Sequence, residues 1–330
     1  MNSNLNIEFE KFHGASNDFI FIADSYLNLF SNQNDLKKFS KIICHRNKGI
    51  GADGIVFYQY QQNNNVSLVR ILILNSDGSF AATCGNALRC LGLKLIQDKI
   101  WDGINQLPIF RLCPQFIFDN LNTISYDEKF ITLKDSFAVL IKAEIQSYYY
   151  AKISVAMGKE LEIKKTPLEE NSLVTFGDFK NMTPIFVSLA NPHWVFISSE
   201  FQKFNRKKYE EFGYFAQNEL RNKSIENNIP IANIGMISFH GKNTNQWNLV
   251  VYERGAGLTE CCGSGGVAAR IALEYSQNID SINDEVYFQM PGGLISISKL
   301  TKINEFGEQR ILSGAAKKVF SGNIPHYLFR

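Results

Sequence analysis

The chain lacks an excess of charge of either sign, a long apolar run and a paired-cysteine metal motif. It carries 34 Lys and Arg against 32 Asp and Glu, so no basic surface for nucleic acid or an anionic membrane is expected. No apolar run approaches the ~18 residues of a membrane-spanning helix. None of the 6 cysteines forms a Cys-x-x-Cys pair, which disfavours a zinc ribbon or a thioredoxin-type site.

The N-terminal residues also lack a basic segment followed by an apolar one, so no secretory signal is predicted. We therefore expect a cytoplasmic protein with reduced thiols, no bound metal, and neither nucleic acid nor membrane as a partner. Its 330 residues, 45% of them hydrophobic, are enough for about two domains with a substantial core.

Three sequence signals occur twice, in the same order and at nearly constant spacing. A polar turn leads into an apolar strand, a glycine leads into a β-rich run, and a cysteine precedes a glycine. The three pairs, 174, 181 and 178 residues apart, are Asn17 and Asn191, Gly54 and Gly235, and Cys84 and Cys262. This repetition predicts two similar halves related by a pseudo-two-fold axis. We place them at residues 1–150 and 151–312, with a C-terminal strand at about 313–330 packing back on the first.

Strands dominate both halves, and each half has one long helix, so the predicted class is α+β. Apolar strands are predicted at 69–74 and 247–252, each followed by a turn. Largely buried helices then follow at 87–96 and from about 265. The strand connections look short and hairpin-like, which argues against a doubly wound parallel sheet. Each half thus places a cysteine at the N-terminus of a buried helix.

Two such cysteines suggest a particular chemistry. The free N–H groups and the dipole at a helix N-terminus bind anions and favour a thiolate. If Cys84 and Cys262 face one substrate α-carbon, one removes a proton while the other delivers one to the opposite face. The helix ends stabilise the charge that builds on the substrate carboxylate. This is a two-base racemisation or epimerisation.

Ordinary structural roles are the alternative for each of these residues. A single cysteine is most often a small buried apolar residue, and we expect this of Cys44, Cys90 and Cys113. Packing does not demand a cysteine before a glycine twice, so function is favoured for the repeated pair. The remaining candidates could equally have structural roles, and the choice stays open at this point. Asn75 and Asn233 would then be turn formers, and His193 a hydrogen-bonded surface imidazole. Glu253 with Arg254 would be an exposed ion pair.

The motifs resemble the cofactor-independent diaminopimelate epimerases over nearly the whole chain. The matching segments, in family order, are Phe12-His13-Gly14 with Asn17-Asp18-Phe19, Gly49-Ile50-Gly51-Ala52-Asp53-Gly54, Asn75-Ser76-Asp77-Gly78, Cys84-Gly85-Asn86-Ala87-Leu88-Arg89-Cys90, Asn191-Pro192-His193, Ala232-Asn233-Ile234-Gly235, Glu253-Arg254-Gly255-Ala256-Gly257, Cys262-Gly263-Ser264-Gly265 and Pro291-Gly292-Gly293. The resemblance implies that each half is a strongly curved, mostly antiparallel, barrel-like sheet around a central helix. It places the active site in a cleft between the halves.

The resemblance also implies roles for individual residues. Cys84 and Cys262 match the acid/base cysteines, and His193 and Glu253 match residues that set their protonation. The carboxylate cradle is matched by Gly85, Asn86, Gly263 and Ser264. The other substrate-binding side chains are matched by Asn17, Asn75, Asn191, Asn233 and Arg254. The implied enzyme is a cytoplasmic homodimeric isomerase without a cofactor. It interconverts LL- and meso-diaminopimelate for lysine and peptidoglycan synthesis.

Several positions depart from the family pattern, and residues 100–130 match it poorly. The departures are Ser16, Gly54, Leu258, Glu260 and Cys261. Two alternatives therefore remain. One is a racemase or epimerase of proline, hydroxyproline or histidine type on the same fold, which would leave Arg254, Asn75 and Asn233 unpaired. The other is a thiol redox or binding protein.

Overall fold

The computed structural model describes residues 6–63, 66–81, 83–111, 137–156, 174–176, 179–189, 191–226, 231–240, 245–276, 284–303 and 306–325. Two compact units make up the chain. The first comprises Met1–Gly158, Ile303–Gly307 and Gly314–Arg330. The second comprises Lys159–Lys302 and Glu308–Ser313.

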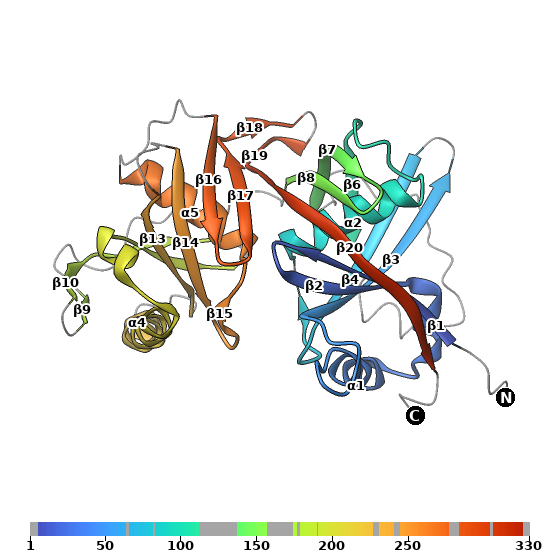
Figure 1. Cartoon of the computed structure of the whole chain (residues 1–330), viewed down its shortest axis with the longest axis horizontal. Helices are drawn as coiled ribbons and strands as arrows, with labels where there is room; N and C mark the ends of the chain where they lie inside the picture. Colours follow the sequence, from blue (N-terminus) through green and yellow to red (C-terminus); the bar gives the residue numbers. More distant parts are fainter. Residues whose placement is uncertain are drawn as a thin grey trace. The chain divides into compact units, whose positions relative to one another are not determined.

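The first unit is a closed, barrel-like sheet of eight strands in the order β1-β2-β3-β4-β6-β7-β8-β20, with β20 pairing back onto β1 (Figure 1). The strands are β1 (Asn6–Gly14), β2 (Asn17–Ala23), β3 (Gly54–Asn63), β4 (Val66–Asn75), β6 (Leu107–Arg111), β7 (Ala138–Ser147), β8 (Tyr150–Ala156) and β20 (Ile311–Pro325), with the short β5 (Phe80–Ala81) beside β4. Closure leaves this sheet without an open edge.

One helix of the first unit is enclosed by the barrel and another packs on it. Helix α2 (Gly85–Gln97) is buried along its first eleven residues and contacts β1, β2, β7 and β8. A helix that is apolar on every side is stable only when it is surrounded in this way. Helix α1 (Gln33–Ile43) is instead amphipathic, and its N-cap Asn32 accepts the N–H groups of Asn34 and Asp35.

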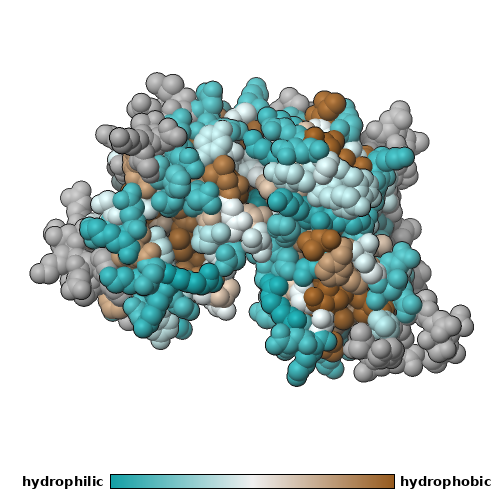
Figure 2. All heavy atoms as spheres, in the orientation of Figure 1, coloured by the Kyte–Doolittle hydropathy of each residue, from teal (hydrophilic) through white to brown (hydrophobic). Residues whose placement is uncertain are grey.

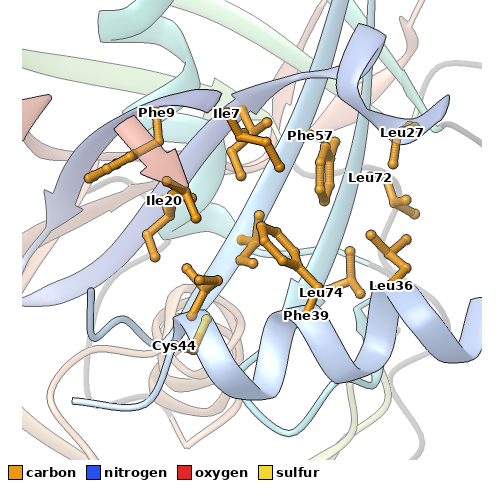
Figure 3. Close-up of a cluster of buried hydrophobic side chains, with 14 of the residues drawn as sticks. Ile7, Phe9, Ile20, Leu27, Leu36, Phe39, Cys44, Phe57, Leu72 and Leu74 are labelled. Carbon is orange, nitrogen blue, oxygen red and sulfur yellow. The ribbon is translucent and has the colours of Figure 1, made fainter. Parts of the chain in front are cut away.

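The α1 helix covers a second apolar core on the other face of the barrel strands. Figure 3 shows Leu36 and Phe39 of α1 pointing toward Phe57, Leu72 and Leu74 of β3 and β4. A 3₁₀ helix, η1 (Asp24–Leu29), adds Leu27 to this cluster. Alternate residues of the same strands therefore bury side chains on both faces of the sheet.

The second unit repeats the arrangement with its own strands and central helix. Its sheet runs β17-β16-β14-β13-β12-β11, with β15 beside β14. The strands are β11 (Ile185–Val187), β12 (His193–Ile197), β13 (Asn233–Phe239), β14 (Gln246–Glu253), β15 (Gly257–Thr259), β16 (Glu285–Met290) and β17 (Gly293–Ser298). Two small two-stranded sheets are formed by β9 (Val174–Phe176) with β10 (Phe179–Met182), and by β18 (Thr301–Lys302) with β19 (Glu308–Gln309).

Helix α5 (Gly263–Tyr275) is the buried helix of this unit and contacts β11, β12, β13, β14 and β17. Helix α4 (Arg206–Glu226) follows the 3₁₀ helix η4 (Ser199–Lys203) and packs through Phe212, Ala216 and Leu220. Its other face is solvated, and Figure 2 shows hydrophilic side chains over the region that α4 occupies in Figure 1.

Both units use one succession of strand pairings. In the first unit β2–β3 is parallel, β3–β4 antiparallel, β4–β5 antiparallel, β4–β6 parallel and β6–β7 antiparallel. In the second, β12–β13, β13–β14, β14–β15, β14–β16 and β16–β17 follow the same order of directions. The predicted α+β class is confirmed. The expectation of hairpin-like connections was incomplete, because helix-containing crossovers create two parallel pairs in each unit.

Candidate functional site

In the first unit, Cys84 is the N-cap of α2, with extended backbone angles (φ −151°, ψ 110°) and no side-chain cap bond. Its thiol is half-buried and is not in a disulfide. The Cys84 carbonyl accepts the N–H of Leu88 at 3.0 Å, while the first N–H groups of an α-helix have no partner within it. The cysteine therefore stands at the helix N-terminus, where backbone N–H groups suit an anion.

The loops that carry Asn17 and Asn75 are tied together by a charged cluster. Asp18 and Asp53 each accept the other's backbone N–H at 3.0 Å, and Arg46 bridges both carboxylates at 2.9 and 2.7 Å. Arg46 and Lys11 hold the pKa of the Asp18 carboxyl low, against the opposing effect of burial, which is the largest influence. The N–H of Ser76 donates to the Asp53 carbonyl at 3.0 Å, so this cluster fixes the loop after Asn75.

Two residues before Asp18, the chain turns through a left-handed conformation. Ala15 and Ser16 have φ values of 51° and 66°. Glycine adopts such angles without a steric penalty, which gives the physical reason that a non-glycine residue at position 16 is unusual. The N–H of Ser16 donates to His13 Nδ1 at 3.3 Å and helps to hold the turn. The adjacent Asn17 keeps a buried side-chain oxygen without a hydrogen-bond partner.

In the second unit, Cys262 is the N-cap of α5, again with extended angles (φ −126°, ψ 109°) and no side-chain cap bond. The residue is only 5% exposed. Its Sγ lies 3.4 Å from the Ser264 hydroxyl, which in turn lies 3.2 Å from His193 Nε2. The sequence motifs Asn191-Pro192-His193 and Cys262-Gly263-Ser264 are thus joined by a chain of hydrogen bonds through Ser264.

Burial and charge set the protonation of this group. Burial first, and then the Glu253 carboxylate, raise the pKa of the Cys262 thiol well above its usual value. Hydrogen bonds to Ser264 and to the N–H of Gly265 oppose that rise only partly. Burial lowers the pKa of His193 to about 3, and its Nδ1 has no hydrogen-bond partner. Both groups are therefore neutral near pH 7.

The end of β14 carries the remaining second-unit candidates. Glu253 accepts a 2.6 Å hydrogen bond from the Thr259 hydroxyl. The side-chain oxygen of Asn233 accepts the backbone N–H of Arg254 at 2.9 Å, so this amide orders the loop. The Arg254 side chain is exposed and donates from Nη1 to the Ile231 carbonyl at 3.1 Å. The Arg254 guanidinium has further N–H donors that suit a carboxylate.

The structure thus groups the predicted residues within each unit. Within the first unit they lie at the start of α2 and on adjoining strand ends, and they are Asn17, Asn75, Cys84, Gly85 and Asn86. Within the second unit they lie at the start of α5 and at the ends of β12, β13 and β14, and they are Asn191, His193, Asn233, Glu253, Arg254, Cys262, Gly263 and Ser264. Cys44, Cys90 and Cys261 are buried as thiols. Cys113 lies outside the described residues.

Two residues in contact with predicted site residues were assigned no role from the sequence. Thr259 orients Glu253, although the sequence shows only an ordinary strand residue there. Arg89 donates to the Asn86 side chain at 2.7 Å, and its only sequence signal is its place in the Cys84-to-Cys90 motif. Among the described residues, no group of three metal-binding side chains occurs. None of the helices described is long and apolar enough to cross a membrane.

Comparison with known proteins finds similarity to diaminopimelate epimerases. The family model for diaminopimelate epimerase matches residues 9–104. The diaminopimelate epimerase of Natranaerobius thermophilus is 27% identical over 98% of this chain and 100% of its own length. That of Methanococcus maripaludis strain S2 is 26% identical over 96% of this chain and 99% of its own.

Solved structures share the fold at much lower identity. A hydroxyproline epimerase from Agrobacterium vitis has a TM-score of 0.62 and 8% identity, covering 99% of this chain and 94% of its own. A PhzF-family protein from Bacillus anthracis has a TM-score of 0.58 and 13% identity, covering 97% and 99%. These likenesses concern the fold alone. The sequence relatives, at 26–27% identity, extend over nearly the full chain, so the chain is similar to the diaminopimelate epimerases from end to end.

Proposed function

We propose that this protein is a cofactor-independent isomerase that interconverts LL- and meso-diaminopimelate, with Cys84 and Cys262 as its two acid/base groups. The observation that carries the proposal is the repeated placement of a cysteine outside any disulfide at the N-cap of a buried 13-residue helix, once in each unit. Packing alone gives no reason for this repetition. The family relationship supplies the substrate class.

In the proposed reaction, a thiolate Sγ removes the proton from the substrate α-carbon on one face. The other thiol then delivers its proton to the opposite face, so the configuration inverts and the two cysteines exchange protonation states. Negative charge spreads onto the substrate carboxylate as the proton leaves. The N–H groups of Gly85 and Asn86, and of Gly263 and Ser264, are suited to stabilise that charge.

The groups around Cys262 favour the thiol in the absence of substrate. Its burial and the nearby Glu253 carboxylate both disfavour a second negative charge. His193 remains neutral and is hydrogen bonded to Ser264, so it adds no positive charge. Cys262 is thereby suited to act first as the proton donor.

The second amino-acid end of the substrate requires further polar contacts. We assign these to Arg254 and to the amides of Asn17, Asn75, Asn191 and Asn233. The exposed Arg254 guanidinium suits the carboxylate at the non-reacting end of the substrate. A substrate with a single amino-acid end, such as proline, would make no contact with these groups, which disfavours the alternative racemase activities.

Isotope exchange tests the proposal directly. The reduced protein is incubated with LL-diaminopimelate in heavy water, and the stereoisomers and α-carbon deuterium are followed. We expect the meso isomer to appear with deuterium incorporated and without added cofactor, and Cys84→Ser or Cys262→Ser to reduce turnover more than about 100-fold. Near-normal turnover in either variant would contradict the two-base mechanism. Exchange with proline but not with diaminopimelate would instead favour the alternative substrate class.

The cellular setting of the enzyme is part of the same proposal. We assign it to the cytoplasm, to the formation of a lysine and peptidoglycan precursor, and to a homodimer. These assignments rest on the similarity to the diaminopimelate epimerases. The diamino diacid is its small-molecule partner.

A further inference from the structure

We propose that Arg89 is a positioning residue that supplies positive charge to the N-terminus of α2 and makes it the stronger anion-stabilising end of the two buried helices. The charge favours the thiolate of Cys84 and a substrate carboxylate bound beside it. The consequence for the substrate rests on the proposed function. The effect on the cysteine does not.

Arg89 is a buried cation that has no carboxylate partner among the described residues. The residue is 0% exposed. Its Nη2 donates to Asn86 Oδ1 at 2.7 Å and its Nε to the Ala315 carbonyl at 3.5 Å, while Nη1 has no hydrogen-bond partner. Both of its partners are neutral oxygens. Burying a charge is costly unless an anion compensates it, so the surroundings of Arg89 favour a nearby anion.

Its position places this charge at the N-terminal end of α2. Helical side chains tilt toward the N-terminus, and the bond to Asn86 holds the guanidinium against the first turn. Gly14, the last residue of β1, leaves the necessary space. A Cβ at that position would lie 3.2 Å from Nη2 of Arg89 and 3.2 Å from the Asn86 carbonyl oxygen. The guanidinium is therefore wedged between this turn, the end of β1 and β20.

The other buried cations on the two central helices are paired with acids. On α2, Lys94 contacts Glu10 and also Asp98, the latter at 2.6 Å. On α5, Arg270 contacts Glu274 at 2.7 Å. Arg89 has no such pair among the described residues. These ion pairs explain why the other two cations are buried, and they leave Arg89 as the exception that requires a different explanation.

The corresponding place in the second unit is apolar. Arg89 lies five residues after Cys84, and Val267 lies five residues after Cys262. Among the charged groups that influence Cys262, the Glu253 carboxylate has the largest effect, and its negative charge disfavours a thiolate. The two helix ends have similar backbones but opposite electrostatic surroundings.

Charged groups on the strands around α2 do not cancel the effect of Arg89. Strand β1 contributes Lys11 and His13, β2 contributes Asp18, and β20 contributes Lys317. Asp18 is paired with Lys11 and Arg46, and burial keeps the pKa of His13 below its usual value. On β7 and β8, the charged residues Lys142, Glu144 and Lys152 are at least partly exposed and paired with one another. A net positive field therefore remains at this end of the barrel.

The test measures the reactivity of each cysteine as a function of pH, without substrate. Iodoacetamide alkylation of Cys84 is followed by tandem mass spectrometry in a Cys262→Ser background, and that of Cys262 in a Cys84→Ser background. Arg89→Met removes the charge at similar length, whereas Arg89→Lys keeps it. We expect Arg89→Met to raise the midpoint of Cys84 alkylation by about one pH unit. We expect Arg89→Lys to restore it and Cys262 to respond to neither.

An unchanged Cys84 midpoint in folded Arg89→Met protein would overturn the inference, as would an equal shift in Arg89→Lys. If Arg89→Met does not fold, Arg89→Gln removes the charge instead, and an unchanged Cys84 midpoint in that variant overturns the inference. Equal midpoints of the two cysteines with Arg89 intact would also contradict the proposal. Because alkylation needs no substrate, a failure of diaminopimelate turnover with the expected Cys84 shift would refute only the proposed function.

Discussion

Stability of the second unit should fall as the pH decreases from 8 to 5, because His193 cannot be protonated in the folded state. Burial lowers its pKa from 6.5 to about 3, and the ring has an unpartnered Nδ1. The unfolded chain binds a proton below pH 6.5 and the folded chain does not. With each pKa unit equal to about 1.36 kcal/mol, this difference costs about 2 kcal/mol of unfolding free energy at pH 5.

Tryptophan fluorescence allows the unfolding of this unit to be measured selectively. Trp194 and Trp247 are buried in the second unit, and Trp101 is the tryptophan of the first. Urea unfolding is therefore compared between Trp101→Phe and Trp101→Phe/His193→Gln at pH 8 and pH 5. Between pH 8 and pH 5, the unfolding free energy of Trp101→Phe should fall by about 2 kcal/mol more than that of Trp101→Phe/His193→Gln.

The comparison of the two variants cancels groups that titrate in both. Asp24, in the first unit, is one such group: burial raises its pKa to about 6. Its contribution has the opposite sign, since it is present at low pH and is lost as the pH rises through about 6. If both variants show the same pH dependence within about 0.5 kcal/mol, the assignment of His193 as a neutral buried group is refuted.

Two further predictions concern the surroundings of Cys262. Thr259→Val removes the hydroxyl that holds Glu253, so kcat should fall about tenfold with a shifted pH profile, and Thr259→Ser should recover both. Equal effects of valine and serine would contradict this role. Gly265→Ala would place a Cβ 2.8 Å from Val251 Cγ2. It should cost about 1–3 kcal/mol in urea unfolding. The control Gly235→Ala meets its nearest atom only at 3.6 Å. It should change stability by less than about 1 kcal/mol, and equal losses would refute the packing argument.

Local sequence features predicted the two central helices and the strands at 69–74 and 247–252, which lie within β4 and β14. The helix expected at 87–96 occupies Gly85–Gln97, and the one expected from about 265 occupies Gly263–Tyr275. Both helices were recognisable because their signals, a continuous apolar run and nearby glycines, lie within or next to the helical segment itself. The parallel pairs β2–β3 and β12–β13 were not predicted. Each joins strands separated by a long crossover, and short-range patterns carry no information on such a pairing.

The sequence by itself determined the α+β class, the repetition of its motifs and the two cysteines at helix N-termini. Each of these depends on residue type and spacing within a few turns of chain. Only the tertiary structure decided that Ser264 links His193 to Cys262, and that Arg89 is buried with no acidic partner in the part of the chain that the structure describes. Those contacts join residues as far apart as Arg89 and Ala315, separated by 226 positions. Burial and the resulting protonation states arise from such long-range packing, so they were decided only when the chain folded.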